Sequence, residues 1–71
     1  MDADPIGSKI KRRREFLRLR QEDLSELSGV TTKTIHLIET GSGNPSLHTL
    51  QKIIAVLGME MLVQVKQNGN G

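Results

Sequence analysis

The chain has 71 residues, which is enough for one small domain and too short for a second hydrophobic core. It contains no cysteine and two histidines, so a disulfide framework and a recognisable metal-ligand set are excluded, and we expect no metal and no cofactor. The net charge of +2 is unevenly distributed, because residues 9–20 hold seven of the ten basic residues and one acid and so carry +6, against −4 in the rest of the chain.

The first predicted helix begins at Asp4-Pro5. Aspartate accepts hydrogen bonds at a helix cap, and proline is tolerated at the first helical position because its missing N–H is not needed there. We expect this helix to reach about Arg18, with the basic cluster around much of its surface. Its predicted apolar side consists of Ile6, Ile10, Phe16 and Leu17.

Two short helices are predicted next. The first begins near Gln21 and is closed by Gly29, a residue able to adopt a positive φ. Thr31 is the predicted N-cap of the second, which covers about residues 32–40 and stops at Gly41. Apolar residues three positions apart mark the faces that we expect to be buried: Leu24 and Leu27, then Ile35 and Ile38.

A fourth helix is predicted between Ser46, its N-cap, and Gly58, which ends it. The loop before it, residues 41–45, is the only loop-rich stretch inside the predicted domain. The apolar positions of the fourth helix keep a spacing of three and four: Leu47, Leu50, Ile53, Ile54 and Leu57.

After Gly58 the apolar period changes to that of a strand over residues 59–66. The chain has no second strand candidate, and an unpaired edge with an apolar face is open to pairing with another chain. We therefore expect a homodimer in which two strands form an antiparallel ribbon across a two-fold axis. The alternative is a strand that folds back on its own helices or is disordered in a monomer. The predicted dimer-strand residues are Met59, Met61, Leu62, Val63 and Val65.

The predicted organisation is an N-terminal extension and cap (1–5), a helical domain (6–58), a dimerisation strand (59–66) and a flexible tail (67–71). Within the helical domain, the two short helices and the turn at Gly29 have the form of a helix-turn-helix. In that motif the first helix crosses the DNA backbone and the second enters the major groove. Any helical hairpin shares part of this pattern, so spacing alone does not decide the function.

Composition excludes several other classes of protein. No apolar run approaches the roughly 18 residues of a membrane span, and the acidic start is unlike a signal peptide, so we expect a cytoplasmic protein. One phenylalanine and no tyrosine or tryptophan leave little to stack on unpaired bases, so a nucleic-acid partner is expected to be a duplex. No nucleophile motif, phosphate loop or metal-ligand spacing is present, and we predict no enzyme activity.

Two segments of the sequence, and the spacing between them, resemble those of a known protein family. The segments Arg20-Gln21-Glu22-Asp23-Leu24-Ser25-Glu26-Leu27-Ser28-Gly29-Val30-Thr31 and Asn44-Pro45-Ser46-Leu47, with the spacing between them, closely resemble the Cro/repressor (XRE) family of helix-turn-helix regulators over about residues 6–58. The resemblance implies a mainly α, four-helix, lambda-repressor-like domain. It also implies a nucleoid-associated transcriptional repressor that binds a palindromic operator in double-stranded DNA.

The chain departs from the usual family pattern at its C-terminal end, where the predicted strand replaces a fifth helix. This departure resembles the HipB-type antitoxins. The resemblance implies an antitoxin that autoregulates its own operon, with a HipA-like kinase toxin or another toxin as partner. A phage-type repressor or a restriction-modification controller without a toxin partner is the alternative.

The resemblance also implies roles for individual residues. Arg14 and Glu39 match an internal ion pair that holds the arginine near a phosphate. Gln21 matches a glutamine that donates to a phosphate, with simple capping of its helix as the alternative. Leu37 packs either on a thymine methyl or sugar, or against the following loop or the dimer partner. The implied base-reading residues are Thr32, Lys33, His36 and Leu37, and the implied phosphate contacts are Arg14, Arg20, Gln21, Thr31, Thr40 and Asn44.

Overall fold

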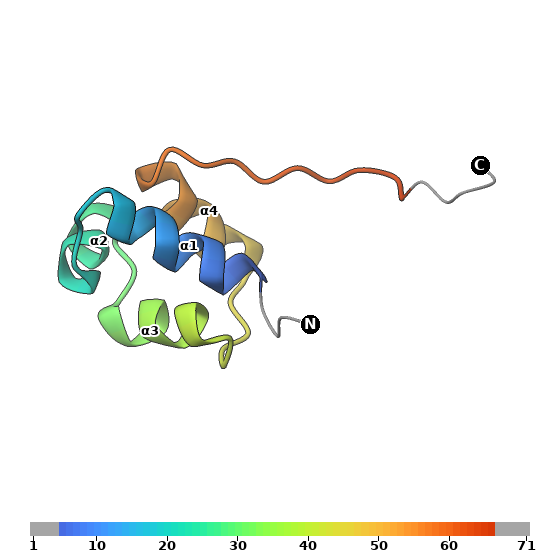
Figure 1. Cartoon of the computed structure of the whole chain (residues 1–71). Coiled ribbons are helices and arrows are strands. Elements are labelled where there is room, and N and C mark those ends of the chain that lie inside the picture. The colour runs from blue at the N-terminus through green and yellow to red at the C-terminus, as the bar shows by residue number, and fades with distance from the viewer. Residues whose placement is uncertain (1–4, 67–71) are drawn as a thin grey trace.

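The computed structural model describes residues 5–66 and forms a small helical body with an extended C-terminal segment (Figure 1). Asp4, the predicted first cap, and the predicted tail 67–71 lie outside the described residues. None of the helices described is long and apolar enough to cross a membrane. The four helices of the described part are α1 (Pro5–Phe16), α2 (Gln21–Ser28), α3 (Thr32–Thr40) and α4 (Leu47–Val56).

The cap residues predicted for α3 and α4 are confirmed. The Thr31 hydroxyl accepts a hydrogen bond from the backbone N–H of Thr34 at 3.2 Å, and the Ser46 hydroxyl accepts one from Thr49 at 3.1 Å. The predicted stops of α2 and α3 at glycine are also confirmed, because Gly29 and Gly41 both have φ of 77°. These four positions fix the end of α2, both ends of α3 and the start of α4.

The predicted end of the first helix is wrong by about two residues, because α1 stops at Phe16 and not at Arg18. Arg18 adopts a left-handed φ of 59°, which allows the N–H of Leu19 to reach the carbonyl of Arg14 and close the last turn. This conformation costs a residue with a Cβ about 1 kcal/mol, so an arginine gives no sequence signal for it. The predicted stop of the fourth helix at Gly58 is confirmed, because α4 runs to Val56 and Gly58 follows its C-cap with a left-handed φ of 69°, which lets the N–H of Met59 reach the carbonyl of Ile54 at 2.9 Å.

The hydrophobic core draws on α1, α2, α3 and α4 together. Several residues of the predicted apolar faces are exposed, because each short helix turns only a narrow stripe toward the core. Leu27 is 62% exposed and Phe16 is 74% exposed, and Leu47 and Ile6 are also largely in solvent. The buried core residues are Ile10, Leu24, Val30, Ile35, Ile38, Ile53, Ile54 and Leu57.

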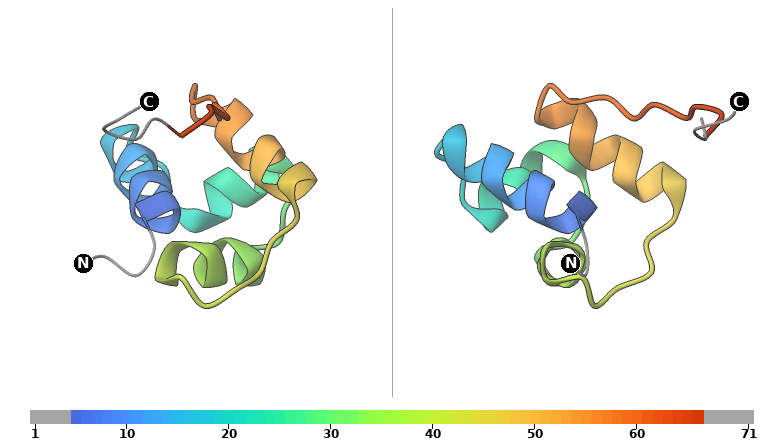
Figure 2. Two further views of the ribbon diagram at one scale, coloured as in Figure 1. Left: turned by 90° about the vertical axis from the view of Figure 1, so that its right-hand side faces the viewer. Right: turned by 45° about the vertical axis from the view of Figure 1, so that its right-hand side comes forward.

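The C-terminal segment, residues 59–66, leaves the helical body in extended form (Figures 1 and 2). Within residues 5–66 no strand is present, because a strand requires a hydrogen-bonded neighbour and a single chain supplies none. Met59 and Met61 are half-buried and pack against the core. Val63 and Val65, by contrast, are 99% and 93% exposed. The predicted strand and ribbon thus stay predictions that concern a second copy of the chain.

Candidate nucleic-acid interface

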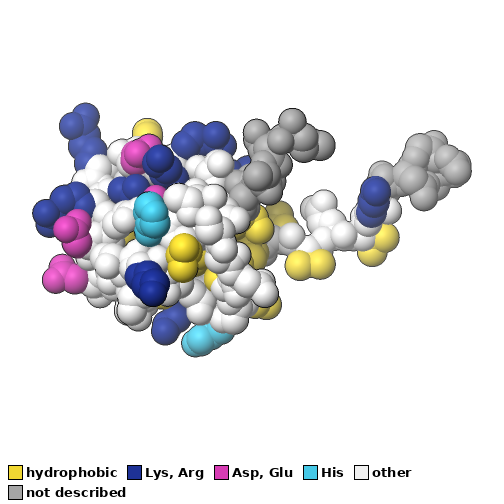
Figure 3. Space-filling model, turned by 90° about the horizontal axis from the view of Figure 1, so that it is seen from below, with side chains coloured by type: hydrophobic (Ala, Val, Ile, Leu, Met, Phe, Trp, Pro, Cys, Tyr) yellow, Lys and Arg dark blue, Asp and Glu magenta, His cyan; other side chains and the backbone are white. Residues whose placement is uncertain are grey.

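Helix α3 presents its predicted base-reading residues on one exposed face. Thr32, Lys33 and His36 are exposed, whereas Ile35 and Ile38 are buried beneath them. The 3.6-residue period separates the two sets, because positions 32, 33 and 36 lie opposite positions 35 and 38. Figure 3 looks onto the side of the body on which α3 lies and shows lysine, arginine and histidine side chains across it.

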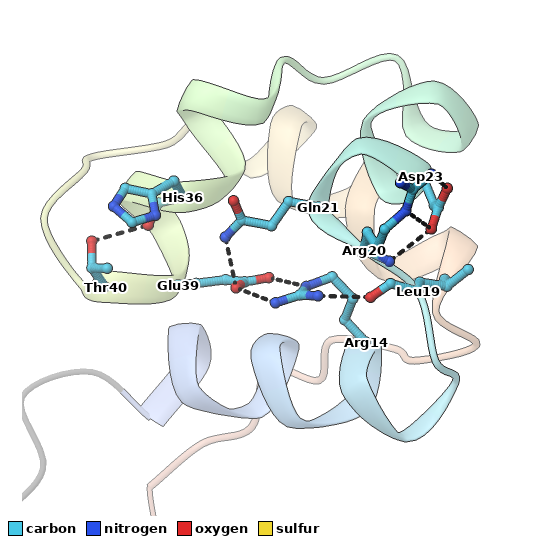
Figure 4. Close-up of polar contacts among 8 residues, drawn as sticks. All are labelled: Arg14, Leu19, Arg20, Gln21, Asp23, His36, Glu39 and Thr40. Atoms are coloured by element: carbon cyan, nitrogen blue, oxygen red, sulfur yellow. Dashed lines mark hydrogen bonds and ion pairs between the residues drawn. The ribbon is translucent and has the colours of Figure 1, made fainter.

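A buried ion pair attaches the inner side of α3, opposite its exposed face, to α1. Arg14 on α1 donates from Nε to Glu39 Oε2 at 2.7 Å and from Nη2 to Glu39 Oε1 at 3.0 Å, and both residues are 8% exposed (Figure 4). Arg14 Nη1 donates to the backbone carbonyl of Leu19 at 2.7 Å. The hydrogen bond to Glu39 raises the pKa of Arg14 above its ordinary value, so the guanidinium stays charged. This bidentate pair fixes the end of α3 against α1.

Gln21, the first residue of α2, joins the same pair. Its Nε2 donates to Glu39 Oε1 at 3.1 Å, so Glu39 connects α1, α2 and α3 (Figure 4). Gln21 is half-buried at the start of α2, where the first backbone N–H groups of a helix favour an anion. The sequence reasoning missed the bond to Glu39, because the two residues are 18 positions apart and no local pattern links them.

The other predicted phosphate-contacting residues lie around α2 and α3, and Arg20, Thr31 and Thr40 have local partners. Arg20 forms an exposed ion pair with Asp23 at 3.1 Å, and the hydrogen bonds from its side chain and backbone N–H lower the pKa of Asp23. Thr31 caps α3, and the Thr40 hydroxyl donates to the backbone carbonyl of His36 (Figure 4). Asn44 is exposed in the loop after α3. Hydroxyl, amide and guanidinium groups of these types donate readily to phosphate oxygens.

The basic cluster of residues 9–20 divides into an exposed part and an internal part. Arg13 is half-buried, donates from Nε to the carbonyl of Leu57 at 2.8 Å and lies 5.3 Å from the centre of the Phe16 ring. Arg13 thus satisfies a backbone carbonyl at the C-terminal end of α4, a role that the sequence reasoning missed. Lys9, Lys11 and Arg12 are exposed.

Leu37 is half-buried and faces the loop that follows α3. A side-chain Cβ placed on Gly43 would lie 3.2 Å from Leu37 Cβ, so the loop backbone comes close to this leucine. This contact agrees with the alternative that Leu37 packs against the loop, and it leaves the other half of the side chain accessible. In the described range 5–66, no group of three or more histidine, aspartate or glutamate residues is placed to hold a metal ion.

Comparison with known proteins identifies the family of this chain. The sequence profile of the helix-turn-helix family matches residues 10–63, which covers all of α2, α3 and α4. The chain belongs to this helix-turn-helix family of DNA-binding transcriptional regulators, and the predicted Cro/repressor (XRE) class is confirmed.

Two relatives are similar to most of the chain. An uncharacterized HTH-type transcriptional regulator of Methanothermobacter thermautotrophicus is 39% identical over 56 residues, which cover 79% of this chain and 81% of the relative. An uncharacterized HTH-type transcriptional regulator of Haemophilus influenzae is 42% identical over 50 residues, which cover 70% of this chain and 51% of the relative. The chain thus matches about half the length of the second protein.

Proposed function

We propose that this protein is a sequence-specific transcriptional repressor that binds as a homodimer to a palindromic operator. One observation carries the proposal: α3 turns Thr32, Lys33 and His36 outward while the Arg14–Glu39 pair holds its inner side. A helix that is fixed in this way enters the major groove with little loss of side-chain and backbone freedom on binding. Occupation of promoter DNA by the dimer then represses transcription.

The exposed residues of α3 have the chemistry for reading base edges. Lys33 donates to guanine O6 or N7, Thr32 contacts a base edge or a thymine methyl, and His36 acts as donor or acceptor. All three lie in the first turns of α3, the part of a recognition helix that meets the bases. Arg14, whose guanidinium is buried against Glu39 and Leu19, contributes by positioning α3.

The proposed phosphate contacts flank this helix and set its orientation. Gln21, Thr31, Thr40 and Asn44 supply amide and hydroxyl groups on both sides of α3. The Arg20–Asp23 pair is exposed, and exposed pairs contribute little to stability, so Arg20 exchanges its carboxylate for a phosphate at low cost. Such contacts fix register and supply affinity without reading sequence.

The proposed dimer rests on the C-terminal segment and the groove beside it. Val63 and Val65 are almost fully exposed. Their side chains therefore contribute nothing to the core of a single chain and are available to a second copy. An apolar groove of about 290 Å³ lies at the base of the segment, between α1 and α4. We assign the second strand of a two-stranded ribbon to the same segment of a second copy. The groove is lined by Ile6, Lys9, Ile10, Ile54, Met59, Glu60, Met61, Leu62 and Val63.

The antitoxin role is part of the same proposal. It is supported by the extended 59–66 segment in the position where the family usually has a fifth helix, the feature that resembles HipB-type antitoxins. In this role the protein represses its own operon and neutralises a HipA-like kinase toxin or another toxin in the cytoplasm. Co-expression with the neighbouring gene tests this role: relief of a growth arrest supports it, and a neighbour without toxicity favours a phage-type or restriction-modification regulator.

The DNA-binding proposal is tested by two substitutions, Lys33→Ala and Gln21→Ala, measured by fluorescence anisotropy on an operator and on random duplex at one salt concentration. Lys33→Ala is expected to cost about 1–3 kcal/mol of discrimination between the two duplexes, because it removes a base contact. Gln21→Ala is expected to weaken binding to both duplexes alike, because it removes a phosphate contact.

Lys52→Ala is the control, because it removes one exposed positive charge from α4 and leaves α3 unchanged. We expect it to retain the preference for the operator. Equal losses on both duplexes for Lys33→Ala and Gln21→Ala would contradict the assignment of α3 as the base-reading helix.

A further inference from the structure

The junction between α4 and the C-terminal segment, residues 57–59, is tied to α1. Leu57 is fully buried, and Gly58 turns the chain with a left-handed φ of 69°. The N–H of Met59 then donates to the carbonyl of Ile54 at 2.9 Å. From α1, Arg13 Nε donates to the carbonyl of Leu57 at 2.8 Å. Segment 59–66 leaves the helical body from this junction (Figure 1).

The rest of the Arg13 side chain is held in place as well. A Cβ placed on Gly58 would lie 3.5 Å from Arg13 Nη2, so the guanidinium lies directly beside the turn. The guanidinium also lies 5.3 Å from the centre of the Phe16 ring, a distance typical of a cation–π contact. Phe16 is 74% exposed, so its ring packs on Arg13 outside the core.

Arg13 and Arg14 connect α1 to two different parts of the molecule. Successive residues of a helix point about 100° apart, so neighbouring side chains reach different elements. Arg14 binds Glu39 at the end of α3, and Arg13 binds Leu57 where the C-terminal segment begins. The direction of the segment relative to α3 is therefore defined through α1.

We propose that Arg13 is a positioning residue that sets the spacing between the two half-sites of the operator. The inference rests on the proposed function, because the segment must join two copies of the chain. Two recognition helices lie about 34 Å apart, so at half that distance a change of about 10° in the direction of the segment moves α3 by about 3 Å. This displacement is close to the rise of one base pair, about 3.4 Å. A contact that fixes this direction thus decides which spacing the dimer fits.

The other contacts at the junction constrain the segment less. The φ of Gly58 and the bond from Met59 to Ile54 shape the turn within the end of α4 itself. Met59 and Met61 pack against the core, but methionine side chains adapt readily to a changed surface. Arg13 adds a directional bond from a different helix, and its planar guanidinium lets Nε donate while Nη2 lies beside Gly58.

The test uses the full chain and an operator selected from a random pool by binding to it. Four duplexes are compared by fluorescence anisotropy at one salt concentration: the selected spacing, one base pair more, one base pair less, and a single half-site. The spacing penalty is the ratio of the affinities for the selected and the altered spacing. For the wild type we expect a penalty of about tenfold, because the DNA must twist or bend to restore the fit.

Two substitutions of nearly equal size separate the hydrogen bond from the charge. Arg13→Gln removes the charge but keeps a donor, because glutamine Nε2 is as many bonds from the backbone as arginine Nε. Arg13→Met removes both the charge and the donor. We expect Arg13→Gln to retain the wild-type penalty and Arg13→Met to lower it about fivefold, the factor equivalent to one hydrogen bond. On the single half-site the two variants should bind alike.

Arg12→Met is the control, because Arg12 is an exposed neighbour on the same helix, and it should keep the wild-type penalty. Circular dichroism and sedimentation equilibrium check that each variant is a folded dimer. Gly58→Ala disturbs the same junction without changing Arg13, since alanine disfavours a positive φ, and it is also expected to lower the penalty. It provides a second test if Arg13→Met does not fold.

The outcomes separate this inference from the proposed function. If the wild type shows no preference for two half-sites over one, the proposed dimeric repressor fails. If the wild type shows the spacing penalty and folded, dimeric Arg13→Met keeps it, the role of Arg13 alone is overturned. That role is also overturned if Arg13→Gln or Arg12→Met loses the penalty to the same extent as Arg13→Met, or if folded Gly58→Ala keeps it.

Discussion

At the scale of single residues, Glu39 connects α3 to both α1 and α2. Its carboxylate accepts hydrogen bonds from Arg14 on α1 and from Gln21 on α2, and it is 8% exposed. Removing one partner of a buried ion pair leaves the other charge in a poorly solvated place, which costs more than the pair contributes. Stability and DNA recognition therefore depend on the same side chain.

We predict that Glu39→Ala lowers the free energy of unfolding by about 3–5 kcal/mol, measured by urea denaturation. Replacing both partners with apolar residues, Arg14→Met with Glu39→Leu, is expected to cost less than Glu39→Ala alone, because no buried charge is then left unpaired. Asp23→Ala, which breaks the exposed pair with Arg20, is the control and should have a much smaller effect. A loss for Glu39→Ala no larger than that of the control would contradict the role given to the buried pair.

The side-chain contacts that were predictable from the sequence join near neighbours, whereas the contacts that were not join distant positions. Thr31 and Ser46 act within three residues of their own positions, so a local pattern reveals them. The bonds from Gln21 to Glu39 and from Arg13 to Leu57 cross 18 and 44 positions, and they depend on how the helices pack. Arg13 was therefore predicted only as part of the basic cluster on the first helix, although it binds the end of α4.

At the scale of elements, the boundaries of α3 decide which residues it can present. The hydroxyl of Thr31 starts the helix, and Gly41 ends it with its N–H bonded to the carbonyls of Ile38 and Leu37. This leaves a helix of nine residues with Thr32 and Lys33 in its first turn. The end of α1 was harder to predict than these boundaries, because Arg18 adopts a conformation that usually marks a glycine.

Thr31, the N-cap of α3, and Ser46, the N-cap of α4, provide a matched pair of substitutions. Thr31→Ala and Ser46→Ala are each expected to lower the free energy of unfolding by about 1 kcal/mol, because each removes the acceptor for one N–H of a first helical turn. Only Thr31→Ala is expected to weaken DNA binding as well, since Thr31 is also a proposed phosphate contact. Thermal denaturation and anisotropy titration of the two variants measure both effects. Loss of DNA affinity in folded Ser46→Ala equal to that in Thr31→Ala would argue against a phosphate contact by Thr31.

At the scale of the whole molecule, the helical body buries its apolar side chains within one chain, and the C-terminal segment does not. The helices bury their own core, whereas Val63 and Val65 lie almost entirely in solvent in the single chain. The alternation of residues 59–66 predicted a strand, but a strand forms only when a partner supplies the second half of the hydrogen bonds. The alternation of apolar residues in 59–66 indicates that this segment can form a strand. It does not identify the strand that pairs with it, which an experiment must find.

Because Val63 and Val65 lie outside the core, the proposed dimer can be tested by substitutions that leave the helical fold unchanged. The double substitution Val63→Lys with Val65→Lys is expected to leave the helical content of the chain unchanged, because both side chains are exposed. It should convert a dimer into a monomer in sedimentation equilibrium, because like charges then face each other across the ribbon. Leu27→Lys, at an exposed leucine on α2, is the control and should remain a dimer. A double variant that dimerises like the wild type would contradict the proposed ribbon.

The selection of bound duplexes from a random pool tests the central claim most directly. A two-fold dimer that places two α3 helices on one side of the duplex must enrich a palindrome with half-site centres about 34 Å, or about ten base pairs, apart. The same selection with Lys33→Ala should lose the preference at one position of each half-site. Enrichment of such a palindrome is the result that we predict. A bound pool with no sequence preference, or with a single asymmetric site, would contradict it.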